Sequence, residues 1–324
     1  MNKIVARSSA LVVGIALVAA LAGCTSGAAG TATTADSSKL KTITFVNPLP
    51  DYPAWKVIGQ CMAKEAKKKG ITFNQSGQSG SSVDTTYMVN RIQQAIANKV
   101  DAILTFPIAA QQFDPLFTQA KKAGIITGTV DSSAPTTNDI NVGTSYEEYG
   151  ALAAETLATK GGKQYVGLIS AAAANNPFVL GFNKWVKDHP NSPIEVVDSR
   201  FDGGDPTQTN GLVAAMLTAH PEINMFLTNE GAATSPIISV LKQKNLKGKV
   251  FLTTNSVYSG SVEGMKDGYV YAFLLQDMCG IGTQSIDSII DFANGSLKTN
   301  NVATKILFAT KDNYQKLTAS GDFQ

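Results

Sequence analysis

Carboxamide side chains follow three of the apolar runs that we interpret as buried strands. Asn229 comes after INMFLT, Asn255 comes after KVFLTT, and Gln276 comes after YVYAFLL. Each carboxamide offers one acceptor and two donor hydrogens, which suits a ligand hydroxyl group that both donates and accepts a hydrogen bond. Because functional residues in open α/β sheets lie at the carboxyl ends of the strands, the three positions predict a site for a hydroxylated ligand.

A carboxylate follows a fourth run of the same kind. Asp131 and Ser132 come directly after IITGTV. A carboxylate accepts strong, charge-assisted hydrogen bonds from hydroxyl donors, so Asp131 fits the same hydroxylated ligand. An Asx turn or a helix cap would place an aspartate at such a position equally well.

Two aromatic residues lie between the first predicted strand and the first predicted helix. Tyr52 and Trp55 flank Pro53, and proline is favoured in the first turn of a helix. An aromatic face at a strand end suits stacking against the C–H face of a sugar ring or polyol. The alternative interpretation is that Trp55 is simply the first core residue of its helix.

The elements that position these residues form one repeating pattern. Short apolar runs alternate with amphipathic segments from residue 42 to residue 309, beginning with TITFVN, a helical pattern over 53–69 that Gly70 ends, and ITFNQ. Strands that alternate with helices are typical of parallel sheets with crossover helices. The pattern restarts after INVGTS at 140–145, so it predicts two doubly wound, three-layer α/β lobes with a ligand cleft between them.

The N-terminus has the pattern of an export signal. Lys3 and Arg7 precede an apolar run over 10–22, which is shorter than the roughly 20 residues that span a membrane. Leu21-Ala22-Gly23-Cys24 resembles the lipobox of bacterial lipoproteins, in which the cysteine thiol receives a diacylglyceryl group. We predict a signal peptide over 1–23 and a lipidated, flexible tether over 24–39 that holds the protein on the outer surface of the cell membrane. A plain secretory signal is the alternative.

Composition argues against several other classes of protein. The chain has 27 basic and 25 acidic residues, and removal of Lys3 and Arg7 with the signal would balance the two, so nothing indicates a nucleic-acid partner. The two histidines, His189 and His220, each precede a proline and belong to no nucleophile motif. No histidine, cysteine and carboxylate cluster has metal-ligand spacing. We therefore expect a binding protein without cofactor or metal, and no enzyme.

Residues 41–310 resemble the ribose-type periplasmic binding proteins, which are the receptors of ATP-binding-cassette (ABC) sugar importers. The resemblance rests on blocks in a fixed order, of which ANKVDAILTFP followed by AKKAGI is the most specific; the others are KTITFVNP, YPAW, RIQQAIANK, VDSS, AAETLATKGG, LTAHPEINMFLTNE and MKDGYVYAFLLQD. In that family the ligand is held by first-loop aromatics, an Asp after the fourth strand, and polar residues at later strand ends. The matching positions are Tyr52, Trp55, Asp131, Asn229, Asn255 and Gln276.

Three departures from the family pattern bear on the ligand. Ser132 stands where the family usually has Arg, Phe178 lies about where a second Arg is common, and Asn255 replaces an Asp. Because an Arg side chain presents a fixed fork of donors, its loss changes which solute fits. The resemblance therefore implies a neutral sugar or polyol as the ligand, and it disfavours an anionic ligand and ribose itself. Ser132 and Phe178 join the matching positions as predicted ligand-binding residues.

The resemblance also implies the lobe boundaries and a cysteine pair. Crossings near 144–145, near 276 and near 302–306 would give an N-terminal lobe of 40–144 plus 277–304 and a C-terminal lobe of 145–276 plus 305–324. Cys61 and Cys279 would then lie on neighbouring helices of the first lobe. A disulfide between them is expected in an oxidising compartment, with two buried free thiols as the alternative.

Taken together, these features predict a monomeric receptor that captures a small sugar or polyol and delivers it to the membrane permease of an ABC-type importer. A chemoreceptor or quorum-signal receptor with the same fold and tether is the alternative function. The sequence does not name the ligand.

Overall fold

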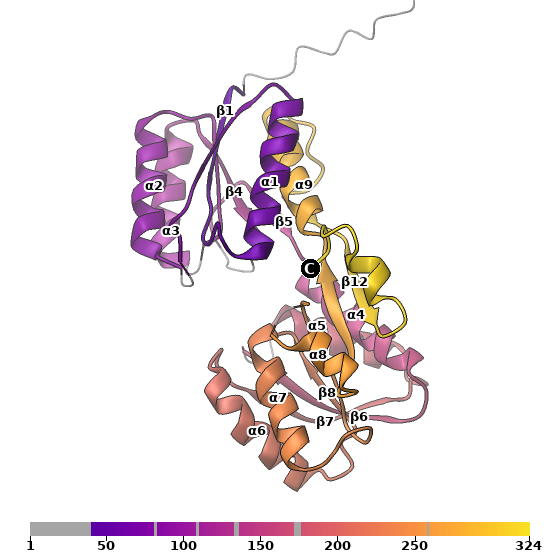
Figure 1. The fold of residues 1–324 in the computed structure, drawn as a ribbon. Helices are drawn as coiled ribbons and strands as arrows, with labels where there is room; N and C mark the ends of the chain where they lie inside the picture. The colour runs from indigo at the N-terminus through magenta and orange to yellow at the C-terminus, as the bar shows by residue number, and fades with distance from the viewer. Residues whose placement is uncertain (1–39, 81–82, 108–109, 133–135, 172–175, 258) are drawn as a thin grey trace, which may run out of the picture. The chain divides into compact units, whose positions relative to one another are not determined.

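The structure, a computed structural model, describes residues 40–324 except 81–82, 108–109, 133–135, 172–175 and 258 (Figure 1). The predicted signal peptide over 1–23, the predicted lipid attachment at Cys24 and the predicted tether to residue 39 lie outside the described residues.

The first lobe is built on a six-stranded parallel sheet in the order β11-β5-β4-β3-β1-β2. Its strands are β1 (Thr42–Val46), β2 (Thr72–Ser76), β3 (Ala102–Thr105), β4 (Ile126–Val130), β5 (Ile140–Gly143) and β11 (Asn301–Ala303). Its helices are α1 (Pro53–Lys68), α2 (Thr85–Ala97), α3 (Ala110–Lys122) and α9 (Met278–Ala293). Helices α1 and α9 cover one face, and α2 and α3 cover the other, which gives three layers (Figure 1).

The second lobe repeats this plan with the order β12-β10-β9-β8-β6-β7. Its strands are β6 (Gln164–Ser170), β7 (Ile194–Phe201), β8 (Met225–Thr228), β9 (Phe251–Asn255), β10 (Val270–Gln276) and β12 (Ile306–Thr310), of which β12 alone runs antiparallel to its neighbour. Its helices are α4 (Tyr146–Thr159), α5 (Pro177–Asp188), α6 (Pro206–Ala219), α7 (Gly231–Gln243), α8 (Ser261–Lys266) and α10 (Tyr314–Thr318).

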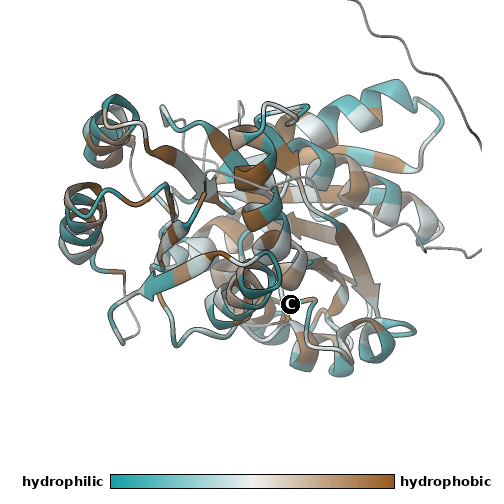
Figure 2. Cartoon of the chain, turned by 90° about the horizontal axis from the view of Figure 1, so that it is seen from above, coloured by the Kyte–Doolittle hydropathy of each residue, from teal (hydrophilic) through white to brown (hydrophobic). Residues whose placement is uncertain are grey.

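The cores explain why these segments form these elements. Buried apolar side chains of each sheet pack against the apolar faces of the helices on both sides, as expected for parallel strands that are covered on both faces. In Figure 2 the strands are largely hydrophobic, whereas the helices combine hydrophobic and hydrophilic residues. The two-lobe α/β fold that the sequence predicts is thus confirmed.

Two short elements differ from expectation. β11 adds an edge strand to the first sheet where we expected only a crossing, and α10 follows β12 near the end of the chain. Elements of three and five residues are too short to produce a recognisable hydrophobic period, so local pattern could not reveal them. The chain passes between the sheets after β5, after β10 and after β11, whereas the predicted limits of the lobes as domains remain a prediction.

A disulfide joins Cys61 on α1 to Cys279 on α9, with the two Cα atoms 5.3 Å apart. The two helices approach closely because Gly282 faces α1. A Cβ atom at this position would collide with the carbonyl oxygen of Ile58 and lie 3.0 Å from the Cβ of Cys61. The helix that follows the second crossing is therefore fastened to the first helix of the same lobe.

Candidate functional site

A cavity of about 370 Å³ is lined by residues from the strand ends of both sheets. One side is formed by the start of α1, the end of β4 and the start of α9, and the other by the start of α7 and the ends of β9 and β10. We call it the interlobe pocket. Its lining residues are Tyr52, Ala54, Trp55, Ile58, Asp131, Gly231, Ala232, Asn255, Ser256, Ser259, Gln276 and Met278.

Five of the eight predicted ligand residues meet in this pocket: Tyr52, Trp55, Asp131, Asn255 and Gln276. They come from four separate places in the chain, and the fold brings them together because the carboxyl ends of parallel strands share one edge of each sheet. Their role in ligand binding remains a prediction.

The aromatic side of the pocket is fixed by packing and by an asparagine. The ring of Trp55 packs against Phe106 and Phe45, with centroids 5.1 and 6.4 Å away. The Asn47 amide donates to the carbonyl oxygen of Trp55 at 3.1 Å, and its own oxygen accepts from the amide of Leu49. Trp55 is half-buried and belongs to both the core and the pocket wall, so it is a core residue, while its stacking against a ligand stays a prediction.

Tyr52 forms the outer part of the same wall. It is 42 % exposed and stands at the N-cap of α1, directly before the proline that starts the helix. Burial raises the pKa of its hydroxyl group, so Tyr52 stays neutral at physiological pH. Tyr52 and Trp55 thus both line the pocket, where aromatic rings suit contact with the C–H face of a sugar ring.

Asp131 is the carboxylate of the pocket, and a hydrogen-bond network holds it. The backbone N–H of Thr144 donates to it at 3.2 Å, and Nε2 of Gln276 donates to both of its oxygens at 3.2 and 3.3 Å. The same Nε2 donates to the hydroxyl of Thr144 at 2.6 Å. Thr144 and Gln276 stand at two of the crossings between the sheets, so the network joins the Asp131 carboxylate to the connections of the lobes.

Burial raises the pKa of Asp131 to about 6, against the opposing effect of the hydrogen bonds from Thr144 and Gln276. The charge of Asp131 in turn adds to burial in raising the pKa of Tyr146. Asp131 also has a left-handed backbone, with φ of 50°. Gly143 permits the close approach of β5 to this residue, because a Cβ atom there would collide with the backbone of Asp131. A ligand hydroxyl that donates a hydrogen bond to the Asp131 carboxylate would replace the hydrogen bonds from water that the carboxylate loses on burial.

The opposite side of the pocket presents an open acceptor. Nδ2 of Asn255 donates to the carbonyl oxygen of Asn229 at 3.2 Å, and Oδ1 is buried without a hydrogen-bond partner among the described residues. A buried acceptor left in this state costs free energy until a donor reaches it. A ligand hydroxyl is a donor of the right kind.

Backbone strain also marks the pocket. Among the described residues other than glycine, five have φ in the left-handed region, and three of these, Asp131, Ser256 and Ser259, line the interlobe pocket. Strained residues concentrate at functional sites. Our selection of site residues left out Ser256, Ser259 and Met278, because φ values and packing partners have no local signal in a single sequence.

The other three predicted residues do not line the pocket. Ser132, which is 7 % exposed, lines a neighbouring hollow with Thr144 and Tyr146. The amide oxygen of Asn229 accepts from the hydroxyl of Ser170 at 3.1 Å, and its backbone oxygen orients Asn255.

Phe178 requires a correction. Its side chain is fully buried in the core of the second lobe, with its ring centroid 4.7 Å from that of Tyr149. An aromatic ring at the start of α5 gains more from packing between α4 and the sheet than from the polar pocket. We therefore remove Phe178 from the proposed ligand residues.

Glu230 is a further acidic group at the end of β8. Burial, followed by the nearby charge of Asp202, raises its pKa to about 7. One of its carboxyl oxygens is buried without a hydrogen-bond partner among the described residues. Glu230 is the N-cap residue of α7, whose first residues Gly231 and Ala232 line the interlobe pocket.

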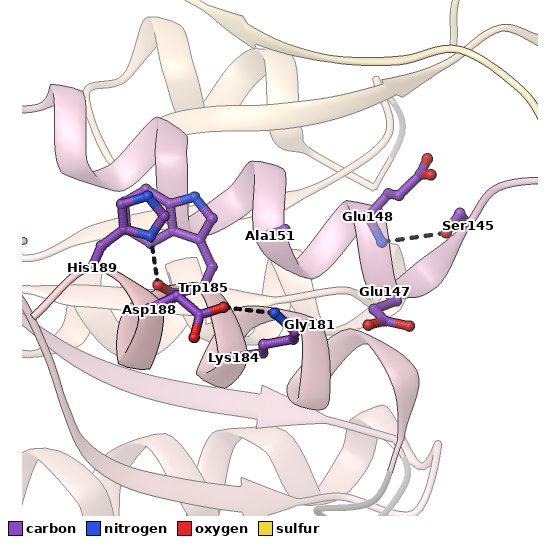
Figure 3. A pocket seen from close by; sticks show the side chains of 9 residues that line it. All are labelled: Ser145, Glu147, Glu148, Ala151, Gly181, Lys184, Trp185, Asp188 and His189. Carbon is purple, nitrogen blue, oxygen red and sulfur yellow. Dashed lines mark hydrogen bonds and ion pairs between the residues drawn. The ribbon is translucent and has the colours of Figure 1, made fainter.

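A second hollow lies away from the strand ends, between α4 and α5 (Figure 3). There the rings of Trp185 and His189 are stacked with centroids 4.0 Å apart, and Nδ1 of His189 is 2.8 Å from the carbonyl oxygen of Trp185. Lys184 pairs with Asp188 at 2.6 Å. These groups satisfy one another within a single helix, so we do not assign a ligand to this hollow.

Within the described ranges, no group of three or more histidine, cysteine or carboxylate side chains is placed to hold a metal ion. In the same part of the chain, no helix combines the length and the apolar character needed to cross a membrane.

Two three-layer α/β lobes whose strand ends meet at one polar and aromatic pocket define a two-lobed solute-binding protein. The family model described as periplasmic binding protein domain matches residues 43–297, so the chain belongs to the periplasmic binding protein family. This is a family of extracytoplasmic solute-binding proteins rather than enzymes, in agreement with the class that the sequence predicts.

Solved structures with the same fold include three sugar-related proteins. A glucose-galactose binding protein from Geobacillus stearothermophilus is 20% identical with a TM-score of 0.71, covering 86% of this chain and 99% of its own. A periplasmic ribose ABC transporter protein from Conexibacter woesei is 17% identical with a TM-score of 0.74, covering 87% and 96%. An arabinose binding protein from Geobacillus stearothermophilus is 18% identical with a TM-score of 0.74, covering 85% and 98%. A comparison with curated protein sequences finds no match.

Proposed function

We propose that this protein is an extracytoplasmic receptor that captures a small neutral polyhydroxy compound, a sugar or polyol, in the interlobe pocket and delivers it to an ABC-type importer. The observation that carries the proposal is the lining of the pocket. It combines the aromatic residues Tyr52 and Trp55 with the carboxamides Asn255 and Gln276 and the carboxylate Asp131, and no lysine or arginine is among the described residues that line it.

Each part of this lining suits a polyhydroxy ligand. The ring of Trp55 offers an apolar face for the C–H side of a sugar, and the amides and the carboxylate offer both donors and acceptors for hydroxyl groups. An anionic ligand would meet the Asp131 carboxylate with no cation lining the pocket, which is unfavourable in a partly desolvated site. The names of the structurally similar glucose-galactose, ribose and arabinose proteins support the same ligand class.

Capture proceeds by closure of the two lobes over the ligand. A ligand that contacts one lobe first and then bridges both binds the closed form more tightly, and this difference in affinity shifts the population towards closure. The closed form is the one that the permease of the importer recognises. The Asp131, Thr144 and Gln276 network lies at two of the crossings, so ligand contact with Asp131 and movement of the connections are mechanically linked.

A thermal-shift screen followed by calorimetry tests the ligand class. The panel contains pentoses, hexoses, inositols and linear polyols, each with an anionic analogue where one exists, such as glucuronate beside glucose. We expect saturable binding of at least one neutral compound, weaker binding of its anionic partner, and no turnover of the bound compound. Binding restricted to anionic compounds, or conversion of the bound sugar, would overturn the proposal.

The aromatic wall yields a direct prediction. Trp55→Ala should weaken binding of the cognate sugar or polyol by on the order of 1–3 kcal/mol, because the ligand loses its stacking face. Isothermal titration calorimetry measures the change. The matched control is Trp185→Ala, which removes the second tryptophan of the sequence, on α5 and outside the interlobe pocket. Equal affinities in the two variants would show that Trp55 does not contact the ligand.

The proposed location rests on the lipobox-like tetrapeptide that ends at Cys24. Diacylglyceryl modification at this cysteine would anchor the receptor close to its permease. Intact mass spectrometry of the mature protein should show cleavage before Cys24 and a lipid adduct, and Cys24→Ala should leave the export signal uncleaved at this site. An unmodified Cys24 in the mature wild-type protein would remove the anchor from the proposal without affecting the receptor.

A further inference from the structure

A further cavity, of about 410 Å³, lies in the first lobe between α2 and the edge strand β2. Its floor is formed by Thr42 and Thr44 of β1, one wall by Asn74 and Ser76 of β2, and the other wall by α2. We call it the α2–β2 groove. None of its lining residues lines the interlobe pocket, so the two cavities are built from different residues.

The polarity of this groove is unusual for its position. Parallel strands of α/β proteins are normally apolar on both faces, and the other face of β1 follows this rule with Ile43 and Phe45 in the core. Towards α2, however, β1 presents two threonines, of which Thr44 is only 9 % exposed. Core packing alone does not account for a hydroxyl-lined floor.

The key residue of the groove is Arg91 on α2. Its Nη1 donates to Oε1 of Gln94 at 2.8 Å, and its guanidinium carbon lies 4.8 Å from the ring centroid of Tyr87. Its Nε is buried and has no hydrogen-bond partner among the described residues, and the same is true of Oγ of Ser76 across the groove. Two residues that line one cavity thus each have a buried polar atom that could form a hydrogen bond with a bound ligand.

Arg91 also lacks a counter-charge. Arg200, the other arginine in the described part of the chain, pairs with Asp198 at 3.0 Å, whereas no carboxylate lies within ion-pair distance of Arg91 among these residues. None of the described residues that line the groove is acidic. The carboxylate of Asp101, near the start of β1, already accepts from the backbone amides of Lys41 and Thr42 at 2.8 Å each.

We propose that the α2–β2 groove binds a small oxyanion, held by the Nε edge of the Arg91 guanidinium and by the hydroxyl groups of Ser76 and Thr44. The fork of an arginine matches the paired oxygens of a phosphate, sulfate or carboxylate, and hydrogen bonds between charged groups are the strong ones. Hydroxyl groups on the floor and on the opposite wall complete the coordination of such an anion. This site is distinct from the interlobe pocket. It would select an anion, whereas the interlobe pocket disfavours one.

The test uses inorganic phosphate, sulfate and acetate as probes on the purified mature protein. Each is titrated at constant ionic strength with chloride as the balancing anion, and binding is followed by the thermal unfolding midpoint and by calorimetry. We expect a saturable response to at least one oxyanion that chloride does not reproduce. Comparison of phosphate and sulfate with acetate separates a tetrahedral oxyanion from a carboxylate.

Variants assign the response to the groove. Arg91→Gln should weaken oxyanion binding by on the order of tenfold or more, Arg91→Lys should restore only part of it because the fork is lost, and Ser76→Ala should weaken it less. The matched control is Arg200→Gln, which should bind the oxyanion as the wild type does. Sugar or polyol binding at the interlobe pocket should be unchanged in all four variants.

Two results would overturn the proposal. One is a wild-type protein whose response to all three oxyanions equals its response to chloride. The other is an oxyanion affinity that Arg91→Gln and Arg200→Gln change equally. If Arg91→Gln does not fold, Arg91→Lys and Ser76→Ala decide the matter, and unchanged oxyanion affinity in both would likewise overturn it.

Discussion

Replacement of Asp131 by asparagine is expected to weaken ligand binding at least tenfold and, at the same time, to stabilise the unliganded protein above pH 6. The affinity falls because a carboxylate accepts charge-assisted hydrogen bonds from ligand hydroxyl groups, and an amide oxygen accepts weaker ones. A tenfold loss corresponds to about 1.4 kcal/mol of binding free energy. Asparagine has nearly the same size and tolerates the left-handed backbone at this position, so the pocket should keep its shape.

The stability gain follows from the sign of the pKa shift. Burial raises the pKa of Asp131 from 3.8 to about 6. A carboxyl group whose pKa is raised by folding favours the folded state at low pH, and this contribution is lost as pH rises through the folded pKa. At about 1.4 kcal/mol for each pKa unit, ionisation costs the folded wild type about 3 kcal/mol between pH 4 and pH 7. The asparagine variant escapes this cost.

Urea denaturation at pH 5 and pH 8, together with calorimetry of the cognate ligand, measures both effects. The excess stability of Asp131→Asn over the wild type should grow from pH 5 to pH 8. Ligand affinity of the wild type should rise over the same interval as the carboxylate ionises, and affinity of the variant should stay constant. Asp312→Asn, at an exposed position outside the pocket, is the control. A variant with wild-type affinity and a wild-type pH profile would remove Asp131 from the site.

Loss of the disulfide between Cys61 and Cys279 is expected to lower the free energy of unfolding by about 2–4 kcal/mol. The bond closes a loop of 218 residues, so in the chain-entropy view it greatly restricts the unfolded state. It also fastens α9, which returns from the second sheet, onto α1, whose first turns carry Trp55 of the pocket wall. The effect should therefore be largest on the first lobe.

The double variant Cys61→Ser, Cys279→Ser, studied by urea denaturation with and without a thiol reductant, measures this contribution. Reductant should destabilise the wild type to about the level of the double variant and should leave the double variant unchanged. Thiol labelling of the unfolded, unreduced wild type should find neither of these cysteines free. Labelling of both, or equal stability of wild type and variant, would contradict the prediction.

The two-lobe fold and five of the residues that line the interlobe pocket could be predicted from the sequence, because both depend on local pattern. Alternation of strand and helix periods needs only neighbouring residues, and it fixes which side chains stand at strand ends. Tyr52, Trp55, Asp131, Asn255 and Gln276 follow from that rule, and all five line the interlobe pocket. The pairing of Cys61 with Cys279 came from family resemblance, and the structure contains the bond.

The contacts of individual side chains near those strand ends depend on the tertiary structure. It buried Phe178 in the core, turned Asn229 towards Ser170 and Asn255, and added Ser256 and Ser259 to the pocket with left-handed backbones. It also left Arg91 without a carboxylate partner among the described residues. A local pattern tells which end or face of an element a residue occupies, whereas the partner of its side chain depends on packing between segments far apart in the chain, and only the folded structure specifies that packing.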